Sequence, residues 1–314
     1  DRILRRIDAR AVARPDLWLT YHNYHKAPDH LGPRVGRALQ IPYVVVEASI
    51  APKRASGPWA DGHAAALAAV RSADAILAVT ERDRACLLAA VQERDRVRRF
   101  PPFIDTEPFA AEDHAATRAR WARALSLPPS VPWILSVAMM RDDVKRRSYA
   151  LLAAALGRCL DLPWILVAVG DGPARGPIEA MLAALGPDRI RLPGALPRLT
   201  LPSLYAACDL FAWPGLEEAF GIVYLEAGAA GLAVVATADG GIPEIVRDGV
   251  TGRLVAPHDG DALAAALRRV LTAPAERLAL GEAARRHVQA VHGRAAAAAA
   301  LADGLAFATA RRRR

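Results

Sequence analysis

Short apolar runs alternate with longer amphipathic segments along most of the chain. In the first third we expect strands at residues 17–21, 43–47 and 75–80, with a further apolar run at 97–100. The segments at 31–39, 63–72 and 85–91 have helical spacing. Alternation of this kind indicates βαβ units that build a parallel sheet.

A second alternating series begins at residue 133. It predicts strands at 133–138, 164–169, 190–192, 210–213, 233–237 and 253–255, and helices at 148–160, 177–185, 201–207, 221–230, 242–247 and 262–271. A rigid, proline-rich stretch at 101–109 is predicted to be a linker, followed by a helix at 118–125, and the alanine-rich stretch at 275–310 is predicted to form one or two helices. We therefore predict an α/β protein with two doubly wound domains, at 1–108 and 109–290, and a terminal helix with a basic tail at 291–314.

Composition supports this division, since 314 residues suit two domains and a hydrophobic content of 53% allows a large core. No apolar run approaches a membrane span, and no signal peptide is visible. The chain begins at Asp1 and not at a methionine, so we expect that an N-terminal piece precedes it. Cys86, Cys159 and Cys208 lack CxxC spacing, which argues against a disulfide framework and favours the cytoplasm. The high alanine and arginine content is typical of a bacterial protein.

The formal net charge is +8, and a run of arginines ends the chain at 311–314. The simplest interpretation is a solvated basic tail. Peripheral contact with an anionic membrane, at its inner face, is the less favoured alternative. No nucleic-acid partner is expected, because nothing resembles a nucleic-acid module and aromatic residues make up only 6%.

The stretch at 213–249 carries the strongest chemical signal. Glu218 and Glu226 flank a Phe220-Gly221 pair that should open a helix, and Gly240-Gly241 follows the next predicted strand. Carboxylates accept hydrogen bonds from hydroxyl groups, and helix N-termini favour negative charge, so this pattern suits a polyhydroxylated, phosphorylated ligand. A solvated helix face would also explain the two acids, but the Ala-Phe-Gly turn exposes backbone and favours function.

Two further loops follow predicted strands and should reach the same sheet edge. One contains Arg141 and Lys145 in the sequence R-D-D-V-K-R-R, which alone would indicate a surface charge cluster. The other contains Gly170 and Gly172. With Gly176 these glycines could form a dinucleotide fingerprint, so an NAD-dependent dehydrogenase is an alternative, although the spacing and Pro173 depart from the usual pattern.

Taken in order, these motifs resemble family 4 glycosyltransferases, of the group 1 glycosyltransferase family. The E-x7-E pattern from Glu218 to Glu226, the G-G-I-P-E-I-V segment and D-G-V-T-G-R-L-V at 248–255 match the family, and 101–109 resembles its linker. The resemblance covers roughly residues 75–271. It implies the GT-B fold, in which two Rossmann-like domains face each other across a cleft, here with an incomplete N-terminal domain. The donor would bind the C-terminal domain and the acceptor the N-terminal one.

The resemblance also implies roles for individual residues. Glu226 would bind the ribose and Glu218 a donor-sugar hydroxyl, while Arg141 and Lys145 would stabilise the departing diphosphate. The remaining donor-binding candidates are backbone and loop positions, namely Gly170, Gly172, Phe220, Gly221 and Ile222. The family usually has Lys-Gly where this chain has Lys145-Arg146, so Arg146 and Arg147 are reserve candidates.

In the first domain, His22 is the catalytic candidate. It lies in a polar segment with two other histidines after a predicted strand, and a structural loop is an equal alternative. If functional, it would contact the acceptor or the donor phosphate, with Glu47, Ser49 and Trp59 as similar candidates. The histidine spacing matches no standard metal site.

We therefore expect a retaining glycosyltransferase that uses a UDP- or GDP-sugar and a sugar, lipid-linked or small-molecule acceptor. No cofactor is expected, and no essential metal, because helix capping explains the D-x-D at 259–261 better than a metal site. A nucleotide-sugar epimerase and a non-catalytic nucleotide-sugar-binding subunit are the alternatives.

Overall fold

The protein is described by a computed structural model that covers residues 2–9, 12–110 and 113–313. The chain forms two compact units, a first unit of Asp1–Pro102 with Ala295–Arg314 and a second unit of Phe103–Arg294. The division lies a few residues before the predicted boundary at 108, because the linker is tied to the second unit. The backbone N–H of Ile104 donates to the carbonyl of His292 at 2.9 Å.

The first unit is built on a four-stranded parallel sheet in the order β1-β2-β3-β4. Its strands are β1 (Trp18–Asn23), β2 (Tyr43–Ala48), β3 (Ala75–Ala78) and β4 (Val97–Arg99). Its helices are α1 (Arg2–Asp8), α2 (Gly32–Leu39), α3 (Ala60–Ser72), α4 (Glu81–Ala90) and α14 (Arg294–Arg312), with short 3-10 turns η1 (Pro52–Arg54), η2 (Gly57–Trp59) and η3 (Arg94–Arg96).

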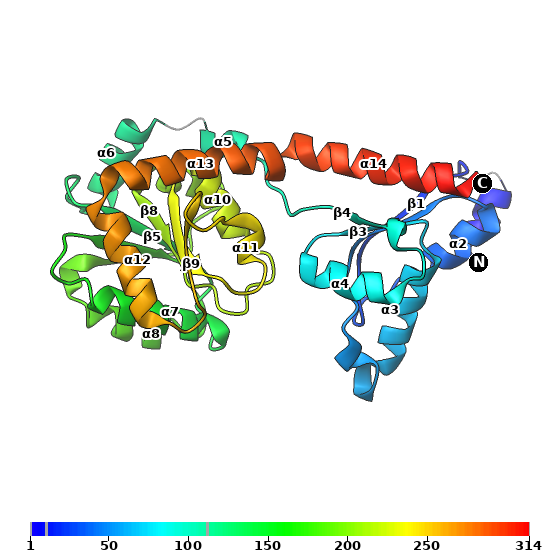
Figure 1. The fold of residues 1–314 in the computed structure, drawn as a ribbon, viewed down its shortest axis with the longest axis horizontal. Helices are drawn as coiled ribbons and strands as arrows, with labels where there is room; N and C mark the ends of the chain where they lie inside the picture. Colours follow the sequence, from blue (N-terminus) through cyan, green and yellow to red (C-terminus); the bar gives the residue numbers. More distant parts are fainter. Residues whose placement is uncertain (1, 10–11, 111–112, 314) are drawn as a thin grey trace. The chain divides into compact units, whose positions relative to one another are not determined.

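Alternating side chains of this sheet pack against different helices. Val45 and Ile76 belong to a core shared with Val70 of α3 and Leu87 of α4. Leu77 belongs to a separate core on the other face, where α14 lies along the sheet (Figure 1). Small side chains let α14 approach closely, and a β-carbon added at Gly304 would lie 2.6 Å from a methyl of Leu77.

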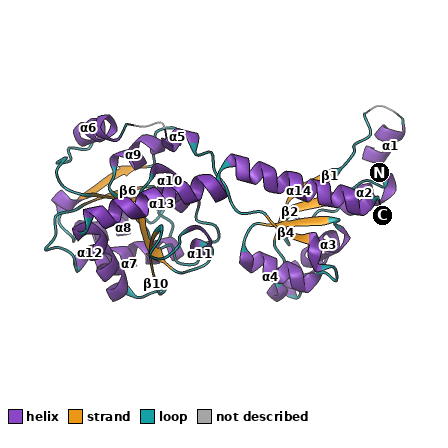
Figure 2. Ribbon diagram, turned by 45° about the horizontal axis from the view of Figure 1, so that its top comes forward, coloured by secondary structure: helices purple, strands orange, loops and turns teal. Residues whose placement is uncertain are grey.

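The second unit is built on a six-stranded parallel sheet in the order β10-β9-β8-β5-β6-β7, with helices on both faces (Figure 2). Its strands are β5 (Trp133–Val137), β6 (Ile165–Val169), β7 (Ile190–Gly194), β8 (Leu210–Ala212), β9 (Ala233–Thr237) and β10 (Gly252–Val255). Its helices are α5 (Glu107–Ala110), α6 (His114–Ala124), α7 (Val144–Gly157), α8 (Arg175–Ala183), α9 (Leu201–Ala207), α10 (Ile222–Ala230), α11 (Ile242–Ile245), α12 (Gly260–Thr272) and α13 (Pro274–His292), with the 3-10 turn η4 (Pro187–Arg189).

The order of this sheet creates a topological switch point. The chain moves outward from β5 through β6 to β7, then returns to form β8 on the other side of β5 and moves outward again to β10. Ile134 of β5 pairs with Leu166 of β6 on one side and with Leu210 of β8 on the other, so β5 is central. In open parallel sheets, ligands bind outside the carboxyl ends of the strands at such a point.

The predicted α/β architecture is confirmed, and the expected strands and helices are present with shifted ends. The alanine-rich terminal stretch forms two helices, α13 and α14. Helices α1 and α5 were not predicted. Helix α1 packs Leu4 and Ile7 against Val35 and Leu39 of α2, a long-range contact that a short local pattern does not show.

We predict that Gly304→Val weakens the first unit, because its branched side chain must displace Leu77 from the sheet face. The expected loss is about 1–3 kcal/mol in unfolding free energy. Ala302→Val is the matched control, since Ala302 lies exposed on the same helix and should change stability by less than about 0.5 kcal/mol. Thermal unfolding and limited proteolysis measure the difference. Equal stability of the two variants would contradict this packing of α14.

Candidate functional site

A hollow of about 460 Å³ lies at the switch point of the second sheet. Its wall is formed by the carboxyl ends of β5, β6 and β8 and by the loops that follow them. The helices that follow β5 and β8, namely α7 and α10, lie on opposite faces of the sheet, so the two loops diverge and leave space between them. Five of the sequence candidates line the hollow together with Gly170: Lys145, Glu218, Phe220, Gly221 and Ile222.

The loop after β6 is bound closely to the loop after β5. Met140 donates its backbone N–H to the carbonyl of Asp171, and Ala174 donates to the carbonyl of Met140, both at 2.8 Å. Gly170 has a φ of 151°, and a β-carbon there would lie 1.9 Å from the carbonyl oxygen of Ala138. Only glycine allows this approach, so the backbones of the two loops lie in direct contact here.

Lys145 and Glu218 form an ion pair in the wall of the hollow. The Nζ of Lys145 donates to Oε2 of Glu218 at 2.6 Å, and the two side chains are only 14% and 19% exposed. Lys145 lies in the first turn of α7, where Asp143 caps the helix by accepting the Lys145 backbone N–H. Removing either partner would leave the other charge largely desolvated, at a cost of about 3 kcal/mol.

The loop that carries Glu218 is held by the glycine pair after β9. The carbonyl of Glu218 accepts the N–H of Gly241 at 2.9 Å. Gly240 has a φ of 57°, and a β-carbon there would lie 1.8 Å from the same carbonyl oxygen. Asp239 accepts the N–H of Glu217 at 2.9 Å. The sequence placed Gly240-Gly241 after a predicted strand, and in the structure this pair supports Glu218.

Helix α10 begins at the hollow, which Phe220, Gly221 and Ile222 line. The first turn of a helix leaves backbone N–H groups without intrahelical acceptors, and the helix dipole adds a partial positive charge. Together with Lys145, this helix end gives the hollow one side that attracts anions. Glu218 gives it a hydrogen-bond acceptor for hydroxyl groups.

Glu226 lies one turn further along α10 from Ile222 and is not among the described residues that line the hollow. Its carboxylate accepts the hydroxyl of Tyr205 at 3.0 Å. Burial raises the pKa of Glu226, while the Tyr205 hydrogen bond and the charge of Arg198 act in the opposite direction. A desolvated carboxylate with one hydrogen-bond partner retains capacity to accept further hydroxyl groups.

The other cations of this loop have different surroundings. Arg141 is 47% exposed, pairs with Asp143 at 3.0 Å, and does not line the hollow in the part of the chain that the structure describes. Arg146 pairs with Asp142 and Arg147 with Glu217, both at the surface. Lys145 is therefore the candidate in this loop that reaches the hollow. Gly172 has a φ of 151° and supports the loop through its approach to Met140 rather than lining the space.

The loop after β7 is part of the wall and was not predicted from the sequence. Ala195, Leu196 and Leu201 line the hollow, as do Met139 and Trp213 at other strand ends. This loop follows a strand that was predicted, so the rule that strand ends gather at one edge could have found it. These apolar side chains make a surface suited to the flat face of a nucleotide base.

His22 and Glu47 form a second polar cluster, within the first unit. The Nδ1 of His22 lies 3.0 Å from Oε1 of Glu47, and the side chains are 47% and 15% exposed. Both residues have left-handed backbones, with φ values of 66° and 56°, where β1 and β2 run side by side. A Glu47 hydrogen bond and burial raise the pKa of Tyr21 to about 12. Two strained residues that are not glycine, joined at the carboxyl ends of strands, mark a functional candidate.

Other first-unit candidates form a row of rings beside this pair. The ring of His22 meets that of Tyr24 at 4.6 Å between centroids, and His25 meets Trp59 at 5.4 Å. Lys26 lies over Trp59 at 5.3 Å. Ser49 is exposed, and its backbone N–H is bound by the carbonyl of Asn23.

Within the described residues, no three histidine, cysteine or acidic side chains are placed to hold a metal ion. The capping interpretation of the D-x-D is confirmed, since Asp259 accepts the N–H of Ala262 at the start of α12. The three cysteines are free thiols. Of the helices in the described ranges, none is both long enough and apolar enough to span a membrane.

The fold is that of an α/β protein whose hollow lies at the switch point of a parallel sheet, and comparison with known proteins specifies the family. The sequence profile of the family "Glycosyl transferases group 1" matches residues 117–287. The chain is 33% identical over 225 residues to a GDP-mannose-dependent alpha-(1-6)-phosphatidylinositol monomannoside mannosyltransferase of Mycolicibacterium smegmatis, a match that covers 68% of this chain and 57% of the relative.

Two further likenesses extend over most of the chain. It is 31% identical over 304 residues to D-inositol 3-phosphate glycosyltransferase 1 of Catenulispora acidiphila, covering 91% of this chain and 72% of the relative. The structure resembles a sucrose-phosphate synthase from Thermosynechococcus elongatus, with a TM-score of 0.73, 25% identity, and coverage of 98% of this chain and 76% of that one. The chain spans roughly half of the length of several curated relatives that it matches.

The chain belongs to the group 1 glycosyltransferase family, and its fold class is GT-B. The resemblance found in its motifs is therefore confirmed. Residues 117–287 lie within the second unit, so the profile match covers the described residues that line the hollow.

We predict that Glu226→Gln raises the melting temperature of the unliganded protein at neutral pH. The pKa of Glu226 in the native state lies above its ordinary value of 4.5, which means that the protonated carboxyl stabilises the fold. This stabilisation is fully present below pH 4.5 and is lost as the pH rises through the native pKa. Glutamine keeps an acceptor for Tyr205 without the charge, so its advantage should shrink as the pH falls toward 4.5. Scanning calorimetry across this range measures the difference.

Glu282→Gln serves as the matched control, because that side chain is 72% exposed on α13. It should melt like the parent protein throughout the range. A melting temperature for Glu226→Gln that is lower than that of the parent at neutral pH would contradict the buried-charge interpretation.

Proposed function

We propose that this protein transfers a sugar from a UDP- or GDP-sugar to an acceptor with retention of the anomeric configuration. The observation that carries the proposal is the placement of Lys145 and Glu218, 2.6 Å apart, in a hollow at the switch point beside the start of α10. A nucleotide-sugar offers a match for each part of this hollow. Its phosphates suit Lys145 and the helix N–H groups, and its sugar hydroxyls suit Glu218.

In the proposed mechanism, the bond between the sugar C1 and the diphosphate oxygen breaks, and its electron pair goes to that oxygen. Lys145 and the α10 N-terminus stabilise the charge that develops there, and Arg141, from the same loop as Lys145, adds to this effect. The acceptor oxygen bonds to C1 on the same face, and its proton passes to the departing phosphate oxygen. No enzyme nucleophile is required.

Glu226 is proposed to bind the ribose, which its remaining acceptor capacity supports. In the first unit, the His22–Glu47 pair is proposed to contact the acceptor, because it combines exposure with a fixed histidine ring. The relative from Mycolicibacterium smegmatis is named for GDP-mannose and a phosphatidylinositol monomannoside. That name favours a GDP-sugar and a lipid-linked acceptor, and hence cytoplasmic placement at the inner face of a membrane.

A nucleotide-sugar epimerase would use the same donor pocket without an acceptor. Incubation with a nucleotide-sugar alone, followed by NMR of the sugar, distinguishes it, because an epimerase inverts a sugar carbon while the nucleotide-sugar stays intact. A binding subunit without catalytic activity would leave donor and acceptor unchanged.

We predict that UDP or GDP raises the melting temperature and that Lys145→Ala removes most of this gain. A nucleotide present at about 100 times its Kd adds about 2.7 kcal/mol to the stability of the native state. Arg146→Ala is the matched control, since it removes the same charge from the next residue, which pairs with Asp142 at the surface. Glu226→Ala should also lose the gain. Absence of any shift with every nucleotide tested would overturn the proposal.

We predict that Arg141→Ala lowers turnover by about 100-fold while changing donor affinity by less than about threefold. Arg141 is exposed, and we expect it to interact most strongly with the negative charge that appears on the diphosphate as the glycosidic bond breaks. Single-turnover release of the nucleoside diphosphate measures the rate, and calorimetric titration measures the affinity. Arg286→Ala, 71% exposed on α13, should leave both unchanged. An equal loss in rate and affinity would assign Arg141 to binding alone.

A further inference from the structure

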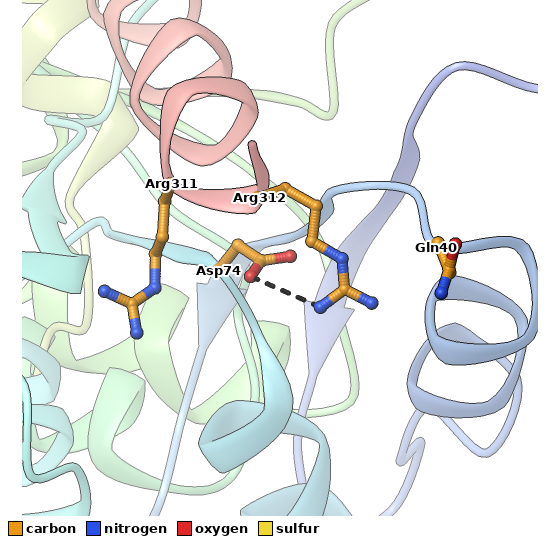
Figure 3. A pocket seen from close by; sticks show the side chains of 4 residues that line it. All are labelled: Gln40, Asp74, Arg311 and Arg312. Atoms are coloured by element: carbon orange, nitrogen blue, oxygen red, sulfur yellow. Dashed lines mark ion pairs between the residues drawn. The ribbon is translucent and has the colours of Figure 1, made fainter. Parts of the chain in front are cut away.

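The first unit contains two adjoining hollows at the edge where β2 and β3 begin. One has a volume of about 680 Å³ and is lined by Gln40, Asp74, Arg311 and Arg312 (Figure 3). The other, of about 210 Å³, shares Asp74 and Arg312 and adds Arg37 of α2. This edge is opposite to the carboxyl ends that carry His22 and Glu47, so the hollows are separate from the candidate acceptor site.

The positive charge of the protein is concentrated in this unit. Residues 1–102 and 295–314 contain 21 Lys and Arg and 12 Asp and Glu, a formal net charge of +9, whereas the second unit has a net charge of −1. The arginines that line the hollows, Arg37, Arg311 and Arg312, come from distant parts of the sequence, and further arginines lie on α1. Helix α1 carries Arg2, Arg5 and Arg6 and packs on α2, and the end of α14 supplies Arg311 and Arg312.

Two arginines that line the hollows, Arg312 and Arg37, have N–H groups that are free to bind a ligand. The Nη2 of Arg312 donates to the carbonyl of Gly36 at 3.3 Å, and its Nη1 lies 3.9 Å from Oδ1 of Asp74. These two contacts use few of the five N–H groups of the Arg312 guanidinium. In Figure 3 its guanidinium projects from the end of α14 toward Asp74, with Gln40 on the other side. The guanidinium of Arg37 is exposed and makes no ion pair with any described residue.

The neighbouring charges are already occupied. Glu93 pairs with Arg311, with Nη2 to Oε1 at 2.6 Å, which fixes that arginine at the rim. Asp74 accepts the backbone N–H of Tyr43 at 2.9 Å and is 11% exposed, so its charge is held within the wall. The groups that face a ligand are therefore mainly guanidinium groups, whose planar donors match phosphate oxygens.

We infer that these two hollows form a binding site for a phosphate group, as a phosphomonoester or a polyphosphate, with Arg37 and Arg312 as the groups that hold it. The site is independent of the proposed sugar transfer, since it shares no residue with the hollow of the second unit. The phosphate can belong to a soluble molecule or to a lipid headgroup, because both present the same oxygens.

Calorimetric titration of the full chain with inorganic pyrophosphate at low salt tests the site. Arg37→Gln/Arg312→Gln should weaken binding by about tenfold or more. Lys53→Gln/Arg82→Gln is the control, because it removes the same charge from exposed positions of the same unit and should stay within about twofold. Arg37→Lys/Arg312→Lys keeps the charge without the planar fork and should give a smaller loss. Melting curves without pyrophosphate verify that each variant is folded.

Pyrophosphate can also bind near Lys145 in the second unit, and titration of the Lys145→Ala variant distinguishes this binding from binding in the first unit. Binding that persists in Lys145→Ala and is lost in Arg37→Gln/Arg312→Gln supports the inference, even if no nucleotide binds the second unit. Equal weakening of pyrophosphate binding in Arg37→Gln/Arg312→Gln and Lys53→Gln/Arg82→Gln overturns the inference. Loss of pyrophosphate binding in Lys145→Ala alone also overturns it.

Flotation with vesicles distinguishes the sources of the phosphate. Phosphatidylcholine vesicles that contain phosphatidic acid are compared with pure phosphatidylcholine vesicles. Vesicle binding that pyrophosphate displaces and that Arg37→Gln/Arg312→Gln lacks identifies a lipid headgroup. Pyrophosphate binding without vesicle binding identifies a soluble phosphate, and both results support the site. Vesicle binding that Arg37→Gln/Arg312→Gln and Lys53→Gln/Arg82→Gln lose equally contradicts a lipid headgroup as the source of the phosphate.

Discussion

The position of β5 beside β8 is the constraint on which the candidate site depends. These strands are neighbours in space but are separated along the chain by two complete βα units. The helices that follow them leave on opposite faces, so their loops cannot close over the sheet edge. Lys145 enters the resulting hollow from the β5 side and Glu218 from the β8 side. Their ion pair joins the two halves of the doubly wound sheet at its open edge.

Much of this arrangement could be predicted from the sequence, because strand periodicity and motif order are local properties. The rule that strand ends share one edge correctly brought Lys145, Glu218 and Gly170 together. Side-chain direction was harder to predict. Nothing local shows that Arg141 pairs with Asp143, or that Glu226 accepts a hydrogen bond from Tyr205. These contacts depend on where the loops pack, which residue spacing does not encode.

The two units differ in how they could hold an anion. In the second unit, the candidates are one lysine and the backbone of a helix end, set in a wall that includes apolar side chains such as Leu196, Leu201 and Trp213. The first unit gathers guanidinium groups at a polar edge, where solvent screens each contact of an exposed side chain and several are needed. The formal net charges of the two units differ in the same sense, with +9 for the first and −1 for the second.

In the Lys145–Glu218 pair, two opposite charges in the wall of the hollow compensate each other. On the proposed function, an intact donor compensates both members at once, with phosphate for the lysine and hydroxyl for the glutamate. The spent nucleotide offers only its phosphates, which leaves the glutamate competing for the lysine. An internal counter-ion of this kind would discriminate against the leaving nucleotide and favour turnover over retention of product.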